Sequence, residues 1–177
     1  PALTDESLLT ELPYSIAALL RQINGFVQFY GGFHCFGVCE QPRWHSLHEA
    51  WQGEQAAHRH YESIDPSDVP FGEDCLGFQF LLRSGQVIYL DMQTGEVEEL
   101  GVELGGFFDW IDANPVENLG MQPLLQLIQE GVTPEPGQLI SEYPPFCTAE
   151  SGNGVSLAAI AALERRSFLV RLHESMQ

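Results

Sequence analysis

The chain has 177 residues, of which 44% are apolar, so it is large enough to bury the core of one domain. Its 25 acidic side chains face seven Arg and no Lys, which gives a formal net charge of −18. This charge argues against binding to nucleic acids or anionic membranes and would attract a basic protein, although solubility alone would also explain it. We find no apolar stretch that could span a bilayer and no signal peptide, and therefore expect a cytoplasmic protein.

Four cysteines are present, at Cys35, Cys39, Cys75 and Cys147, and none forms a CxxC pair. Cys35 and Cys39 lie in an apolar run that is typical of a strand. On a strand they would be about 13 Å apart, which is too far for a disulfide. We expect all four thiols to be reduced, as in a reducing compartment.

The first half of the chain begins with the clearest helix, Pro13–Asn24, whose apolar side chains recur at i, i+3, i+4 and i+7 and which ends before Gly25. A short strand follows within Phe33–Val38. The polar, Ala-rich and His-rich segment Ser46–Tyr61 predicts a surface helix. The Pro, Gly and Asp content of Asp65–Asp74 predicts a loop.

A meander of three strands is predicted next, over Phe78–Arg83, Val87–Asp91 and Glu96–Leu100, with turns at Ser84-Gly85 and Gln93-Thr94-Gly95. The middle strand is apolar on both faces, so we expect it to be covered on both sides. The third strand carries three Glu residues, which predicts an edge strand blunted by charge.

The second half of the chain should be mainly helical. Apolar spacing predicts a helix over Leu104–Asn114, another that includes Met121–Ile128, and a final helix over Ala162–Ser175. Thr133–Gly154 is rich in Pro and Gly and predicts an irregular surface tail, while Val155–Ala161 could extend the last helix or form a strand. Consecutive strands flanked by helices predict an α+β fold with a central antiparallel sheet.

Several of these segments, taken together, resemble the SUKH superfamily. They are the "LP" helix that ends at Asn24-Gly25, the Val69–Asp74 motif VPFGED with Gly77, the Val87–Glu96 hairpin VIYLDMQTGE, and the helix that carries Phe107–Ile111. The similarity covers roughly residues 8–130. It implies a SUKH-like domain over residues 1–131 and a C-terminal extension over 132–177, packed on the same domain. The sequence departs from the family pattern at Phe78, because members of the superfamily often carry a polar residue directly after the glycine that corresponds to Gly77.

The resemblance implies a non-enzymatic protein-binding domain without a cofactor. Bacterial members of the superfamily are mostly immunity proteins that neutralise toxins, so the leading hypothesis is an inhibitor of a basic toxin domain. An intracellular adaptor or regulator of the fungal cell-wall-regulator type is the alternative. A small-molecule sensor or enzyme, with a pocket under the Asp65–Asp74 loop, is the second alternative.

An acidic docking surface is the functional site that the sequence favours. Between Glu62 and Glu117 there are 13 acidic residues and one basic residue, Arg83, so the local charge is −12. Such a surface would accelerate the encounter with a basic partner, although it could also be an ordinary solvated face. The residues that we expect to contact the partner are Asp65, Asp68, Glu73, Asp74, Asp91, Glu96, Glu98 and Glu99.

Other candidate sites have plainer explanations. His45, His48, His58 and His60, with Glu49 and Glu54, could bind zinc, but their spacing matches no metal motif and favours a polar helix face. Cys35 and Cys75 are expected to be packing residues. Trp44 and Trp51 are expected to cover the core, or else to act as aromatic anchors at an interface. We expect neither catalytic residues nor a metal.

Overall fold

Six strands pair in the order in which they follow one another along the chain, β1-β2-β3-β4-β5-β6, in the computed structural model, which describes residues 7–177. Every neighbouring pair is antiparallel. The strands are β1 (Phe26–Gln28), β2 (Phe33–Cys35), β3 (Val69–Asp74), β4 (Gln79–Arg83), β5 (Gln86–Leu90) and β6 (Val97–Glu103). A separate antiparallel hairpin consists of β7 (Gln138–Tyr143) and β8 (Ser156–Ala161).

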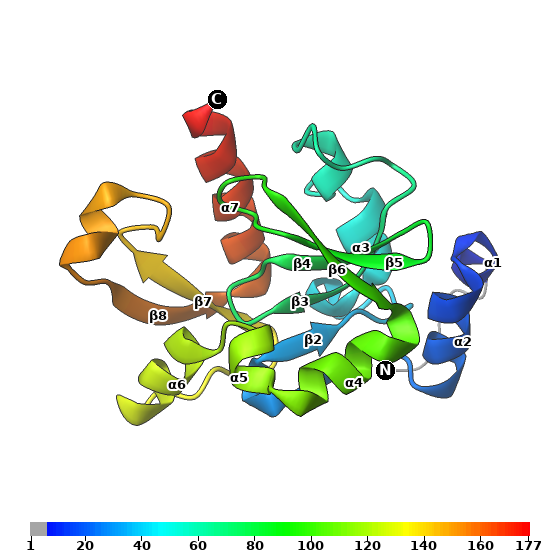
Figure 1. Ribbon diagram of the computed structural model, residues 1–177, viewed down its shortest axis with the longest axis horizontal. Helices are drawn as coiled ribbons and strands as arrows, with labels where there is room; N and C mark the ends of the chain where they lie inside the picture. Colours follow the sequence, from blue (N-terminus) through cyan, green and yellow to red (C-terminus); the bar gives the residue numbers. More distant parts are fainter. Residues whose placement is uncertain (1–6) are drawn as a thin grey trace.

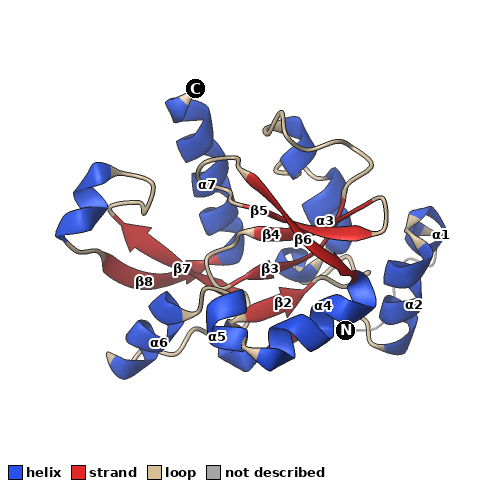
Figure 2. Ribbon diagram, viewed as in Figure 1, coloured by secondary structure: helices blue, strands red, loops and turns tan. Residues whose placement is uncertain are grey.

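Helices cover both faces of the sheet (Figures 1 and 2). They are α1 (Leu8–Glu11), α2 (Tyr14–Gln22), α3 (Leu47–Gln52), α4 (Leu104–Ala113), α5 (Pro115–Asn118), α6 (Gln122–Gln129) and α7 (Ala162–Met176), with 3₁₀ turns at Phe29–Gly31, Arg43–His45, Ala57–Arg59 and Ala149–Asn153. The expected α+β fold with a central antiparallel sheet is therefore confirmed. Among residues 7–177, no helix combines the length and apolar character that crossing a bilayer requires.

One face of the sheet is packed with aromatic side chains against α4. Phe107 of α4 is fully buried, and its ring centroid lies 4.9 Å from that of Phe80 and 5.5 Å from that of Phe33. Phe71 and Tyr89 extend this cluster, because each lies beside Phe80. We call this the α4 face.

The opposite face carries polar side chains and is covered by α7. Residues that pair directly across antiparallel strands point to the same side, and His34, Glu73, Gln79 and Leu90 form such a row across four strands. All four are buried, and Arg166 of α7, which covers this face, donates a hydrogen bond to Glu73. We call this the α7 face.

The predicted meander is confirmed in β4, β5 and β6. Ser84 and Gly85 have φ values of 50° and 87°, the left-handed pair that a two-residue type I′ hairpin requires. Strand β6 is the edge of the sheet, as expected from its glutamates. The helices predicted from apolar spacing are also present as α2, α4, α6 and α7.

Two predictions in the first half of the chain are wrong. The segment Asp65–Asp74 is not a loop, because Val69–Asp74 forms the buried strand β3. Its Pro70 lies where the pairing register with β4 shifts, a position at which a missing N–H is tolerated. The helix predicted over Ser46–Tyr61 stops at Gln52, since Gly53 adopts an extended conformation and ends it.

The C-terminal part of the chain also differs from the prediction. Within the expected irregular tail Thr133–Gly154, strand β7 pairs over six residues with β8. Val155–Ala161, left open between helix and strand, therefore contributes a strand. Figure 1 shows this hairpin beside α7, which contacts both of its strands.

Candidate functional site

The eight acidic residues predicted to form one docking surface occupy two different environments. Asp65, Glu96, Glu98 and Glu99 are exposed, and Asp91 is half-buried. Asp68, Glu73 and Asp74 are buried, with at most 2% of each residue accessible to solvent. The prediction of an acidic surface is therefore wrong for these last three residues, because their side chains are buried and add no charge to an exposed face.

Each of the three buried carboxylates has an internal partner that explains its position. Asp68 accepts hydrogen bonds from the Arg83 guanidinium, at 3.0 and 2.5 Å. Glu73 pairs with Arg166, and Asp74 accepts from Tyr89. The sequence does not reveal that these carboxylates are buried, because the segment that contains them resembles an exposed loop in composition.

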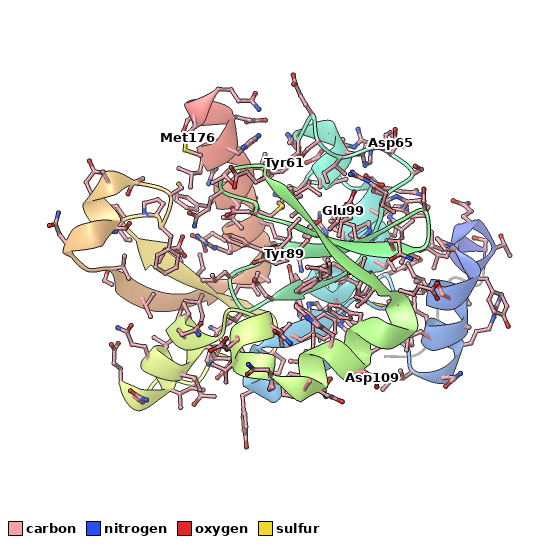
Figure 3. The ribbon with its side chains drawn as sticks, viewed as in Figure 1. Tyr61, Asp65, Tyr89, Glu99, Asp109 and Met176 are labelled. Carbon is pink, nitrogen blue, oxygen red and sulfur yellow. The ribbon has the colours of Figure 1, made fainter. Side chains whose placement is uncertain are left out.

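Four glutamates remain together at the free edge of the sheet, and we call Glu96, Glu98, Glu99 and Glu103 the β6 strip. All four are exposed. Glu98 lies opposite Tyr89 and Glu99 lies opposite Ile88, so the strip presents charge on both faces of the edge strand. Figure 3 shows Glu99 over β6, with Asp65 and Asp109 toward the margins of the molecule.

Basic side chains are absent from the sequence around this strip. Between Arg83 and Arg165 the chain contains no Lys, Arg or His. Strand β6 ends the sheet, and within the described part of the chain no further strand pairs with its outer edge. The strip is therefore a negatively charged edge whose backbone is open to a partner.

A buried network on the α7 face joins Glu73 and His45 to His34 and Arg166, two residues that the sequence did not single out. His34 Nδ1 lies 2.9 Å from Glu73 Oε1, and His34 Nε2 lies 2.7 Å from His45 Nδ1. Arg166 donates from Nε to Glu73 Oε2 at 2.8 Å and from Nη2 to Glu73 Oε1 at 2.5 Å. Its Nη2 also donates to the carbonyl oxygen of Trp44 at 2.9 Å.

The charges in this network follow from burial and contact. Burial alone would raise the pKa of Glu73, but the Arg166 guanidinium and the hydrogen bond from His34 outweigh it and lower the pKa to about 2. Burial lowers the pKa of His34, and burial with the neighbouring His34 lowers that of His45 to about 4. Because a carboxylate only accepts, neutral His34 donates from Nδ1 to Glu73 and accepts at Nε2 from His45 Nδ1–H; this leaves His45 Nε2 without a hydrogen, 3.4 Å from the carbonyl oxygen of Asn24.

A second buried ion pair lies beside the first. Arg165, which is fully buried, donates from Nη2 to both carboxylate oxygens of Glu142, at 3.0 and 2.8 Å. Its Nε donates to the carbonyl oxygen of Leu76 at 3.0 Å, and Gln93 donates to Glu142 from the other side. Arg165 and Arg166 are the only adjacent arginines in the sequence and the first basic residues after Arg83. This isolation is the signal that could have identified them.

Asp74 points to the opposite face from Glu73 and organises the β3–β4 turn. Its Oδ1 accepts from the backbone N–H groups of Leu76 and Phe78, at 2.8 and 3.1 Å. Its Oδ2 accepts from the hydroxyl of Tyr89 at 2.8 Å. Burial raises the pKa of Asp74 to about 7 despite these three donors.

The raised pKa predicts how stability depends on pH. Because folded Asp74 binds its proton more tightly than unfolded Asp74, its contribution is complete below about pH 4 and is lost as the pH rises toward 7. Asp74→Asn should therefore gain stability relative to the wild type between about pH 5 and pH 8, measured by urea unfolding at several pH values. The exposed Asp109→Asn is the control. Parallel pH profiles for Asp74→Asn and wild type would contradict the prediction.

The histidines do not gather into a metal site. His45 is buried in the network with His34, whereas His48 is exposed. His60 bonds to Glu174 at 2.9 Å and to the carbonyl oxygen of Glu54 at 2.8 Å, and His58 lies partly exposed nearby. Among residues 7–177 no group of three metal-ligating side chains is close enough to hold an ion.

The tryptophans and cysteines largely pack as the sequence suggests. Trp51 lies against the core, and its Nε1 donates to the carbonyl oxygen of Pro66 at 3.1 Å. Trp44 is half-buried, and its ring centroid lies 5.0 Å from that of His34. All four cysteines are free thiols; Cys35 and Cys75 are buried in the core, and Cys39 is buried too, whereas Cys147 is exposed. Burial raises the pKa of the Cys75 thiol well above its usual value.

A pocket of about 190 Å³ opens beside the buried network, between β1 and the segment that leads into β7. Val27, Trp44 and Leu139 line it together with His34 and Glu73, and we call these last two, which are buried, its floor. This is not the pocket that we expected under an Asp65–Asp74 loop. Residues 69–74 form a strand, and Glu73 is the only residue of that segment that lines this pocket.

The chain was compared with protein-family models, with characterised proteins and with solved structures, and none of the three comparisons found a match.

Proposed function

We propose that this chain is a non-enzymatic protein-binding domain that captures a basic partner protein through the β6 strip. The observation that carries the proposal is an open sheet edge with four exposed glutamates, in a part of the chain that has no basic side chain. Complementary charge accelerates association and rejects acidic partners. The open backbone of β6 offers hydrogen bonds to a strand of the partner.

The partner that best fits the sequence resemblance is a basic toxin domain, for which this chain would be the immunity protein. A toxin that acts on nucleic acid is basic where it contacts phosphate, so an acidic edge can occupy that surface. Four free thiols agree with a cytoplasmic inhibitor, because reducing conditions prevail there. An adaptor of the cell-wall-regulator type would use the same edge for other cellular partners.

Buried polar groups favour binding over catalysis. The carboxylates and imidazoles of Glu73, His34 and Asp74 bond to other protein groups. A general acid or base must reach the proton that it transfers. Binding of a partner at the exposed β6 strip does not require these buried groups to reach a substrate.

The proposal predicts that charge at the strip controls capture of the partner. The triple variant Glu96→Gln, Glu98→Gln, Glu99→Gln should lose most of the partner that the wild-type chain retains from host lysate at low salt. High salt should weaken the wild-type complex in the same way, because the Debye length falls from about 10 Å at 0.1 M to about 3 Å at 1 M. The retained proteins are identified by mass spectrometry.

A matched variant, Glu117→Gln, Glu130→Gln, Glu150→Gln, removes the same charge from exposed positions outside β6. It should retain the partner as the wild type does. Equal loss from both variants would show that only overall charge matters and would contradict a site at β6. Co-expression of the captured protein then separates the two functions, because only a toxin should halt growth in a way that this chain reverses.

A further inference from the structure

The pocket between β1 and the segment that leads into β7 has a floor whose polar groups are already hydrogen-bonded to other protein groups. Both oxygens of Glu73 are engaged by Arg166 and His34, and the remaining nitrogen of His34 is engaged by His45. A polar or charged group that reached this floor would lose its water without gaining a partner. The floor therefore selects an apolar group.

The strand beside the pocket is the second free edge of the sheet. Strand β1 lies at the end of the strand order, and across residues 7–177 no strand pairs with its outer side. Val27, at its centre, is 43% exposed and lines the pocket. Val27 lies directly opposite His34, so both side chains point to the α7 face. A peptide residue paired with Val27 would point to that same face, toward the pocket.

The rim of the pocket carries a negative charge. Glu135 lines the pocket and is exposed, and no cation of the described chain pairs with its carboxylate. Tyr30, 82% exposed, lies on the same rim. Side chains two residues apart on a strand are about 7 Å apart on the same face. The neighbours of an apolar side chain in the pocket would therefore come near the rim, where a basic residue is favoured.

We propose that the outer edge of β1 and the adjacent pocket bind an extended peptide segment in which one large apolar side chain is flanked, two residues away, by basic residues. The segment adds a strand to the sheet and places its apolar side chain between Val27, Trp44 and Leu139. Backbone hydrogen bonds supply affinity, and the pocket supplies specificity. The site lies at the opposite edge of the sheet from β6 and does not depend on the proposed function there.

The test uses the peptide acetyl-Arg-Thr-Leu-Thr-Arg-amide and the full chain labelled with ¹⁵N. We expect saturable shifts of the Val27 amide and of the Trp44 indole N–H, the latter assigned with Trp44→Phe. Changing the peptide leucine to alanine should weaken binding by about tenfold or more, because a buried apolar side chain is lost. Glu135→Gln should weaken it by about two- to fivefold, and Glu150→Gln, an equal loss of exposed charge outside the pocket, should not.

Each contrary outcome overturns a defined part of the proposal. Shifts confined to β6 would mean that the cationic peptide binds the acidic strip, and the pocket site would be lost. Equal binding of the leucine and alanine peptides would remove the apolar subsite. Equal binding to Glu135→Gln and wild type would remove the role of charge at the rim. Tight binding of N-acetyl-leucine amide alone would make this a small-molecule pocket without strand addition.

Discussion

Replacing Arg166 with methionine should lower the free energy of unfolding by about 3–5 kcal/mol, because it leaves the Glu73 carboxylate buried without its main partner. Arg166 is 3% exposed and Glu73 is inaccessible to solvent, so water cannot replace the lost hydrogen bonds without opening the core. Urea unfolding followed by circular dichroism measures the change. Arg171→Met removes an exposed arginine from the same helix and should change stability by less than about 0.5 kcal/mol.

The double variant Glu73→Gln, Arg166→Met separates the ion pair from general damage to the helix. If the cost of Arg166→Met arises from an unpaired buried charge, removing that charge should recover much of it, and the two single effects should not add. His34 can still donate to the oxygen of the glutamine. Strict additivity would show that Arg166 acts through packing alone, for example through its contact with the ring of Phe36.

Replacing Phe107 with alanine should lower the free energy of unfolding by about 3–5 kcal/mol through the cavity that it leaves. Phe107 is fully buried, and its ring contacts those of Phe33, Phe71 and Phe80. These rings come from β2, β3, β4 and α4, so a collapse that fills the cavity would have to move several elements together. Thermal and urea unfolding of the variant measure the loss.

Phe146→Ala is the comparison for this variant, because Phe146 is 41% exposed and lies outside the buried core. It should cost far less than Phe107→Ala. A loss below about 1 kcal/mol for Phe107→Ala would mean that α4 can repack onto the sheet, and that the aromatic cluster does not fix its position.

The parts of the fold that the sequence predicts are those in which pattern and environment agree. The hairpin over β4 and β5 has alternating or fully apolar strands around a Ser84-Gly85 turn, and α2 and α4 carry regular apolar stripes. Strand β3 lacks such a pattern, because two carboxylates, a proline and a glycine are among its six residues. Its carboxylates are tolerated only because the chain supplies partners at Arg166 and Tyr89, and sequence spacing does not reveal those pairings.

The same reasoning explains the partial success at the candidate site. Glutamates on an edge strand look exposed in the sequence and are exposed in the structure, since within residues 7–177 no strand pairs with the outer edge of β6. Asp68, Glu73 and Asp74 carry the same charge and lie in the same acidic stretch, yet each faces inward. Net charge identifies an acidic protein, but only long-range pairing separates the carboxylates at its surface from those inside it.

The pairing of Glu73 with Arg166 has a consequence for how the protein is made, because the two residues are 93 positions apart. A ribosome that has completed the six-stranded sheet at Glu103 has yet to add α7, so Glu73 at that stage lacks its guanidinium partner, Arg166. Until α7 is added, the α7 face stays uncovered, and the unpaired Glu73 carboxylate opposes its burial. Completion of the α7 face is thereby tied to the synthesis of α7, and a chain that terminates before this helix would leave the Glu73 carboxylate without Arg166.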